Sequence, residues 1–273
     1  MTLQNDLSVL KHDVSGHGEP LVLVPGGLTG WLSWIPHADA LSAMRKVIRL
    51  QLLSVELGLL GAPLPPRYSV DFEVNALHNT LNMLGIEQAD FAAWSYGAEI
   101  ALSYALHHPD RVQSLTLIEP SAFWILHSRG LYSQDVLDGH RFHKSLATDD
   151  VTEEQLVKFS HFAGFVPEDM DPRSLPQWTV WFTHRQSLRF GDIPFQHEDN
   201  IELVRRFQKP VLLVRGEGSS PYYHDIIDVL FEELPDARVV TFPGRHAPHI
   251  ISIQPFLERF TRFLSQRKPS QLG

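Results

Sequence analysis

One serine stands where its hydroxyl could act as a nucleophile. Ser95 follows an apolar run, residues 91–93, and precedes a stretch with helical character, residues 98–106. A strand, a sharp turn and a helix in this order would hold the serine oxygen above a sheet, over the positive end of the helix. The turn needs small residues on both sides, and Ala93 and Gly97 meet that need. The pattern predicts nucleophilic catalysis by Ser95, although a lone motif of this length also fits an ordinary serine in a strand-to-helix turn.

A serine hydroxyl becomes a good nucleophile only when a base takes its proton, and His246 is the best-placed candidate. It lies in a loop with glycine and prolines, residues 242–249, after the last predicted strand. This position would bring the imidazole to the carboxyl edge of the sheet beside Ser95. His249 in the same loop is an alternative base, and a histidine on a surface loop is the interpretation without catalysis.

Two carboxylates could orient that histidine. Glu119 comes directly after an apolar run, residues 115–118, while Glu217 lies in the loop after a later run. We prefer Glu119, because the strand end next to that of Ser95 lets its carboxylate reach His246. A helix-capping or ion-paired carboxylate is the alternative role for this residue. The prediction is a triad of Ser95, His246 and Glu119.

A tetrahedral intermediate needs two hydrogen-bond donors aimed at its oxygen. The backbone N–H of Tyr96, directly after the serine, is one candidate. The second is the N–H of Gly27 in the loop formed by residues 25–30, because glycine lets the backbone approach a substrate closely. A flexible turn is the alternative explanation for this loop.

The segments that must position these residues alternate between strand-like and helix-like. Runs with the length of buried strands occur at residues 21–24, 47–50, 91–93, 115–118, 211–214 and 238–242. This alternation predicts an α/β fold with a mostly parallel, doubly wound sheet. Between residues 119 and 209 the alternation stops, which predicts a helical cap over residues 123–201, inserted into a core of residues 1–122 and 202–273.

The predicted cap carries more aromatic side chains than a thin lid needs for its own packing. They are Phe123, Trp124, Phe142, Phe159, Phe162, Phe165, Trp178, Trp181 and Phe182. Some should face an apolar pocket above the serine, which would favour substrates with acyl chains or rings, although any single ring could instead belong to the lid core. We expect Trp124 and Trp181 from the cap, and Leu28 and Trp94 from the core, to line this pocket.

Composition narrows the classes of partner. The 273 residues carry a formal net charge of -9, and no clustered basic face is apparent, which argues against nucleic acid. There is no cysteine, so a thiolate nucleophile and a thiolate metal site are excluded. Without a recognisable secretory signal or membrane-spanning run, we expect a cytoplasmic protein away from membranes. No compact histidine signature or nucleotide fingerprint occurs, so neither a metal nor another cofactor is expected.

Ser95, Glu119, His246 and the loop of residues 25–27 together resemble the α/β-hydrolase superfamily, with Ala93 in place of the first glycine of its usual G-x-S-x-G motif. The resemblance covers nearly the whole chain except the cap. It implies a serine hydrolase that acts through an acyl-enzyme and needs no cofactor.

A narrower resemblance, to the zearalenone-type lactonases, rests on residues 24–28, Glu119 and residues 242–246. Those enzymes also use a glutamate after this strand, whereas Ser219 stands where most of the superfamily carries its acid. The likeness implies a small-molecule ester or lactone as substrate, with acyl homoserine lactone as a candidate. A short-chain esterase, a carbon-carbon bond hydrolase, a thioesterase and a ligand receptor without turnover stay open, as does the oligomeric state.

Overall fold

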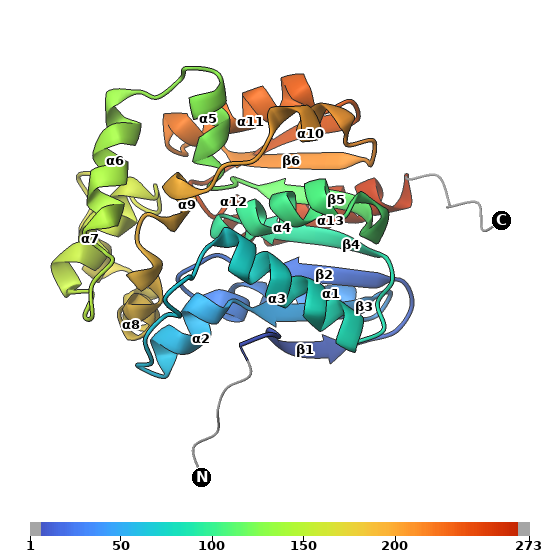
Figure 1. Cartoon of the computed structure of the whole chain (residues 1–273), viewed down its shortest axis with the longest axis horizontal. Coiled ribbons are helices and arrows are strands. Elements are labelled where there is room, and N and C mark those ends of the chain that lie inside the picture. Colours follow the sequence, from blue (N-terminus) through green and yellow to red (C-terminus); the bar gives the residue numbers. More distant parts are fainter. Residues whose placement is uncertain (1–6, 267–273) are drawn as a thin grey trace, which may run out of the picture.

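A seven-stranded sheet forms the centre of the computed structural model, which describes residues 7–266 (Figure 1). The strands are β1 (Lys11–Ser15), β2 (Pro20–Val24), β3 (Lys46–Gln51), β4 (Ala89–Trp94), β5 (Val112–Ile118), β6 (Val211–Gly216) and β7 (Ala237–Phe242). Their order across the sheet is β1-β3-β2-β4-β5-β6-β7, with β1 antiparallel to β3 and all other neighbours parallel. The predicted α/β fold is confirmed.

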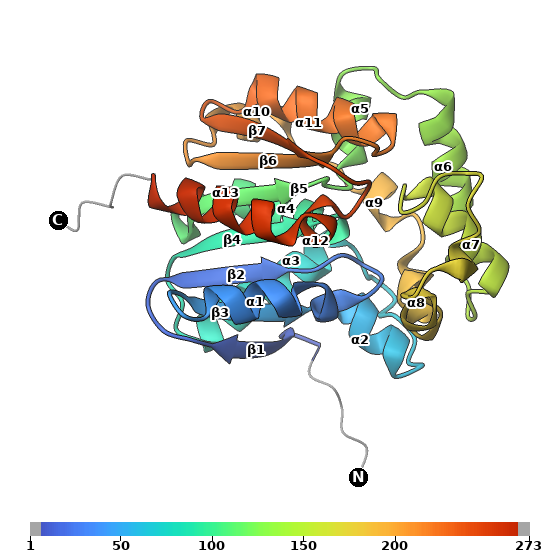
Figure 2. The same cartoon turned by 180° about the vertical axis from the view of Figure 1, so that it is seen from behind.

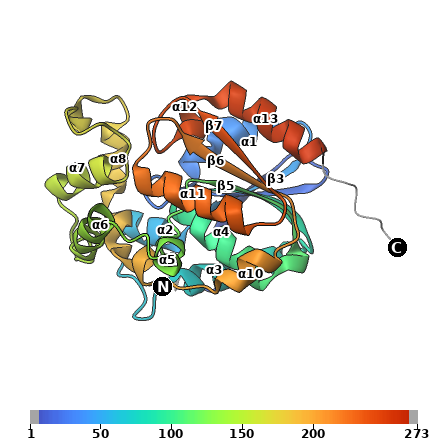
Figure 3. The same cartoon turned by 90° about the horizontal axis from the view of Figure 1, so that it is seen from above.

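Helices cover both faces of this sheet (Figures 2 and 3). One face carries α1 (Ile35–Leu41), α12 (Pro248–Ile251) and α13 (Ile253–Ser265), and the other carries α3 (Val70–Met83), α4 (Tyr96–His107), α10 (Ile201–Arg206) and α11 (Pro221–Glu233). Within residues 7–266, no helix has the length and apolar character needed to cross a bilayer. The two layers of helices bury the sheet on both sides.

This double burial explains why the central strands are readable as continuous apolar runs. Along β2, the side chains of Val22 and Val24 belong to one buried cluster, and those of Leu21 and Leu23 belong to the cluster on the opposite face. Successive side chains of a strand point to opposite faces, so both sets must be apolar here. All six predicted strands lie within the parallel strands β2 to β7.

Strand β1 is absent from the prediction. It is the antiparallel edge strand, with the polar sequence Lys-His-Asp-Val-Ser, and each of its five residues is at least partly exposed. An edge strand that faces water on one side needs no continuous apolar run. Its register is set by pairing with β3 rather than by burial of its own side chains.

Between β5 and β6 the chain forms helices instead of strands. They are α5 (Phe123–Ser128), α6 (Gln134–Lys144), α7 (Glu153–Phe162), η3 (Pro172–Ser174), α8 (Trp178–His184), η4 (Arg185–Phe190) and α9 (Ile193–Gln196), followed by α10. Figures 1 and 3 show α6, α7 and α8 beyond one end of the sheet, next to α2 (Leu53–Leu59). Helix α5, which the predicted boundary at residue 123 assigns to the cap, packs against α11 of the sheet layer. The two remaining short helices are η1 (Gly30–Trp34) and η2 (Pro109–Arg111).

Candidate active site

Ser95 occupies a sharp turn between β4 and α4. Its backbone has φ 56° and ψ -125°, a region that residues with side chains rarely adopt. The neighbouring strand end holds this turn in place: the N–H of Ser95 donates to the carbonyl of Ile118 (2.9 Å), and the N–H of Ser121 donates to the carbonyl of Ser95 (3.2 Å). The turn is the strand-serine-helix geometry that the sequence predicts.

Gly97 is a position where this turn tolerates no side chain. A Cβ there would lie 2.1 Å from the carbonyl oxygen of Pro25 and 3.0 Å from Cγ1 of Val24. We expect Gly97→Ala to destabilise the protein by about 1–3 kcal/mol, because helix and strand would have to separate. Thermal unfolding measures this effect. Gly218→Ala is the matched control, since a Cβ there would meet its nearest neighbour at 3.4 Å. Equal unfolding midpoints for the two variants would contradict the close-approach argument.

The three residues predicted to form a triad lie in one hydrogen-bonded chain. Ser95 Oγ is 2.8 Å from His246 Nε2, and His246 Nδ1 is 2.8 Å from Glu119 Oε2. Glu119 and His246 are buried, whereas Ser95 is partly exposed. Because a carboxylate only accepts, Nδ1 carries the proton and Nε2 is free to accept from the serine hydroxyl. The arrangement can move the serine proton to the imidazole and stabilise the resulting cation.

Glu119 is fixed by the ends of two strands. Its backbone has φ 44°, its N–H donates to the carbonyl of Val214 (3.1 Å), and its Oε1 accepts from the N–H of Gly216 (2.7 Å). The second carboxylate oxygen is therefore held toward His246. The alternative acid, Glu217, is exposed. The geometry favours Glu119 as the orienting carboxylate.

The alternative base, His249, lies behind the site. Its ring packs 4.9 Å from Trp34, 5.4 Å from His37 and 5.0 Å from Trp94, measured between ring centroids. Neither of its ring nitrogens has a hydrogen-bond partner among the described residues. Burial holds the pKa of His249 well below its ordinary value, so this imidazole is neutral. It is placed as a packing residue rather than as a base for Ser95.

The two expected oxyanion donors line the same cavity as Ser95. Tyr96 is the first residue of α4, so its N–H has no acceptor within the helix. At Gly27 a Cβ would lie 2.8 Å from the ring of Phe190, so this position also excludes a side chain. Both residues thus border the cavity at Ser95, where a tetrahedral intermediate would form.

Side-chain contacts hold Tyr96 in place. Its ring stacks on Phe190 with centroids 4.5 Å apart, and its hydroxyl lies 3.2 Å from that of Tyr68. The Tyr68 hydroxyl in turn donates to the buried carboxylate of Glu73 (2.6 Å), which also accepts backbone N–H groups at the start of α2. Burial raises the pKa of Tyr96 well above its usual value, so the phenol stays protonated.

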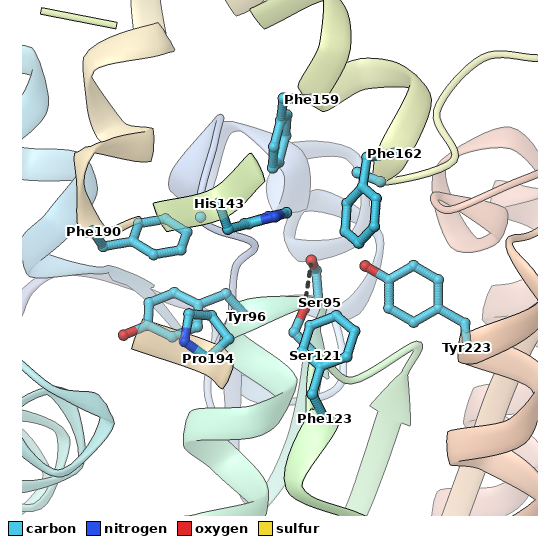
Figure 4. A pocket seen from close by; sticks show the side chains of 12 residues that line it. Ser95, Tyr96, Ser121, Phe123, His143, Phe159, Phe162, Phe190, Pro194 and Tyr223 are labelled. Carbon is cyan, nitrogen blue, oxygen red and sulfur yellow. Dashed lines mark hydrogen bonds between the residues drawn. The ribbon is translucent and has the colours of Figure 1, made fainter. Parts of the chain in front are cut away.

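Aromatic rings enclose the cavity above Ser95 (Figure 4). Phe159 and Phe162 come from α7, Phe123 from the start of α5, and Phe190 from the end of η4. The cavity measures about 30 Å³, which is room for about two water molecules. Three of these rings belong to the aromatic set of the predicted cap, so the expectation that some of that set face the serine is met.

The four side chains expected to line this pocket lie elsewhere. None of them borders the cavity at Ser95. Trp94 stands behind the base: its Nε1–H donates to the backbone carbonyl of His246 (2.7 Å). Trp181 packs among the cap aromatics, while Leu28 and Trp124 are buried in the main core cluster.

Three polar side chains at the cavity were not predicted from the sequence. Ser121 and Tyr223 lie close to the reacting atoms, and His143 enters from α6. Ser121 follows Glu119 by two residues on the same strand end, which is the one sequence signal that could have found it. His143 and Tyr223 carry no local motif, because only the packing of the cap and of α11 brings them to the serine.

No cationic side chain lines the cavity in the part of the chain that the structure describes. His143 donates its Nδ1–H to the carbonyl of Gly139 (3.0 Å), and burial lowers its pKa to about 4. It is therefore neutral near pH 7, with Nε2 as an acceptor. Neither a lysine nor an arginine of residues 7–266 lines this space. Among residues 7–266, no three histidine, aspartate or glutamate side chains gather as metal ligands would.

Comparison with known proteins identifies the family and the fold. The model of the family described as alpha/beta hydrolase fold matches residues 19–252. A 2-hydroxymuconate semialdehyde hydrolase of Pseudomonas sp. (strain CF600) is 31% identical over 156 residues, which make up 52% of this chain and 54% of that protein. The chain thus spans about half the length of this curated relative.

Solved structures align over nearly the whole chain. An esterase from Exiguobacterium antarcticum superimposes with a TM-score of 0.78 at 17% identity, covering 94% of this chain and 96% of the other. The enol-lactonase from Burkholderia xenovorans LB400 does so with a TM-score of 0.71, at the same identity and coverage. At such identity, both similarities speak for a shared fold.

Proposed function

The chain belongs to the α/β-hydrolase fold family, and from this premise we propose that it is a serine hydrolase of carboxylic esters, lactones included. The observation that carries the proposal is the hydrogen-bonded chain from Ser95 through His246 to Glu119, with 2.8 Å at each step. A hydroxyl, a base and an orienting carboxylate in this order are the requirements for acyl transfer through serine.

The proposed reaction has two halves. The Ser95 oxygen attacks the ester carbonyl while His246 Nε2 takes the serine proton, and the N–H groups of Gly27 and Tyr96 bind the oxyanion. His246 then protonates the leaving alcohol, and an acyl-enzyme is left. Water attacks this ester with His246 again as base, and the acid and the free serine are released. The buried carboxylate of Glu119 stabilises the imidazolium in both halves.

The size and polarity of the cavity favour a short, uncharged acyl group. Its walls are mostly aromatic, and its volume of about 30 Å³ admits only a few atoms. A longer chain, such as that of an acyl homoserine lactone, would require Phe159 or Phe162 to move. No relative named above is described as acting on that lactone, so it stays a substrate prediction.

A carbon-carbon bond hydrolase is the second candidate, because the curated relative described above hydrolyses 2-hydroxymuconate semialdehyde by its name. A muconate semialdehyde carries a carboxylate. A buried carboxylate needs a cation or several hydrogen-bond donors nearby. The uncharged cavity at Ser95 therefore favours ester hydrolysis.

A pair of substrates of similar length separates these candidates. We expect kcat/KM for p-nitrophenyl valerate to exceed that for p-nitrophenyl hemisuccinate by about 100-fold, because the hemisuccinate would bring its carboxylate among aromatic rings. Release of p-nitrophenolate measures both rates, and the rate with Ser95→Ala corrects for spontaneous hydrolysis. Equal rates, or preference for the anion, would contradict the ester proposal and favour a carboxylate-bearing substrate.

A further inference from the structure

Two hydroxyl groups beside the triad have no part in the reaction as described so far. The hydroxyl of Tyr223, on α11, lies 3.2 Å from His246 Nε2, the nitrogen that also faces Ser95. Ser121 Oγ lies 3.5 Å from Ser95 Oγ. Tyr223 and Ser121 both line the cavity at Ser95. These oxygens therefore form one polar cluster around Nε2.

Tyr223 is held firmly in this position. Its ring stacks on the imidazole of His246 with centroids 4.3 Å apart and an angle of 11° between the planes. In Figure 4 its hydroxyl points toward Ser95, and a dashed line joins Ser95 to Ser121. Burial raises the pKa of the Tyr223 phenol far above its usual value. It is thus a hydrogen-bond donor at any working pH.

Acyl transfer requires that an oxygen atom of the leaving alcohol or of the attacking water lie beside His246 Nε2. The leaving alcohol in the first half, and the attacking water in the second, must each lie within about 3 Å of His246 Nε2. The Tyr223 hydroxyl lies 3.2 Å from the same nitrogen and points toward Ser95 (Figure 4), so an oxygen bound between Nε2 and Ser95 would be within its reach. Elsewhere the cavity wall is mostly aromatic. A water molecule needs two to four polar partners, and this cluster supplies them.

We infer that the hydroxyls of Tyr223 and Ser121 bind the hydrolytic water and, before it, the leaving-group oxygen. This inference rests on the proposed function. The water gives one hydrogen bond to His246 Nε2 and one to Ser121 Oγ, and accepts one from Tyr223. Its remaining lone pair then points at the acyl carbon.

The step balances without further reactants. The water oxygen bonds to the acyl carbon as its proton passes to His246 Nε2. The bond from the acyl carbon to Ser95 Oγ then breaks, and His246 returns the proton to this oxygen. Tyr223 and Ser121 keep their protons throughout.

Tyr223→Phe tests the donor, because it keeps the stacked ring and removes only the hydroxyl. In stopped-flow measurements with p-nitrophenyl acetate, we expect deacylation to slow by about 10- to 100-fold, the effect of one lost hydrogen bond at a buried site. Acylation should change less, because His246 still protonates the good leaving group. The variant should therefore release one equivalent of p-nitrophenolate in a burst.

Ser121→Ala tests the acceptor by a different measurement. Methanol has only one hydroxyl proton, which goes to His246, so it never uses Ser121 as acceptor. In mixtures of methanol and water, we expect the ratio of methyl acetate to acetate to rise several-fold in this variant. A purely structural role for Ser121 would leave the ratio unchanged.

Tyr104→Phe is the matched control. It removes the hydroxyl of a buried tyrosine on α4 whose ring packs against Phe91 and His108, away from the cavity at Ser95. Its burst of p-nitrophenolate and its ratio of methyl acetate to acetate should equal those of the wild type. If Tyr223→Phe deacylates at the wild-type rate and Ser121→Ala gives the wild-type ratio of methyl acetate to acetate, the inference about the water site is wrong. The proposed function is untouched by that result. Turnover by the wild type no faster than by Ser95→Ala would overturn the proposed function, and the inference with it.

Discussion

Ser95→Ala should lower kcat for p-nitrophenyl acetate by about 10⁴- to 10⁶-fold, the range that loss of a serine nucleophile causes in a triad enzyme. The hydroxyl is the one group placed to attack, with His246 2.8 Å from its oxygen. The unfolding midpoint should stay close to that of the wild type, because alanine needs no more space in the turn.

Initial rates at saturating ester measure the loss. Ser265→Ala is the control, since this exposed serine only donates to the carbonyl of Arg262; its kcat should be unchanged. A Ser95→Ala variant within tenfold of the wild type would exclude covalent catalysis by this residue.

Glu119→Gln should lower kcat by about 10³- to 10⁴-fold, with a fold as stable as the wild type's. A glutamine can keep the hydrogen bond from Gly216 through its amide oxygen, which turns its NH₂ group toward His246 Nδ1. The imidazole must then accept at Nδ1 and carry its proton on Nε2, the tautomer that cannot accept from Ser95.

Glu217→Gln is the matched control for this variant, because Glu217 is exposed and follows β6 in the loop where an acid is usual. Its kcat should stay within about twofold of the wild type. Similar losses of kcat in the two variants would contradict the assignment of Glu119 as the orienting carboxylate. A loss of kcat confined to Glu217→Gln would assign that role to Glu217.

The sequence predicts the sheet and the triad of Ser95, Glu119 and His246 because both depend on local patterns. Strands buried on both faces must be mostly apolar, so β2 to β6 stand out. The edge strand β7 is recognisable by its own apolar residues, whereas the polar edge strand β1 is not. Ser95, Glu119 and His246 each follow a predicted strand, and the carboxyl ends of parallel strands share one edge of the sheet. The predicted strands are therefore enough to predict that these three residues lie close together.

The pocket could not be predicted in the same way. On α5, Phe123 lines the cavity and Trp124 does not, because one residue along a helix turns the side chain by about 100°. Trp94 directly precedes Ser95 but belongs to the core cluster on the opposite face of the sheet. Tyr223 reaches His246 only through the packing of α11, which no local pattern encodes.

The most direct test of the central claim is to locate the residue that becomes covalently modified. The protein is inactivated with a p-nitrophenyl methylphosphonate ester, whose adduct with serine is stable, and the labelled peptides are identified by mass spectrometry. We predict one phosphonyl group per chain, on Ser95, with esterase activity falling in proportion to its formation and no adduct in Ser95→Ala. Labelling at another residue, or ester turnover that persists after full modification of Ser95, would contradict the account.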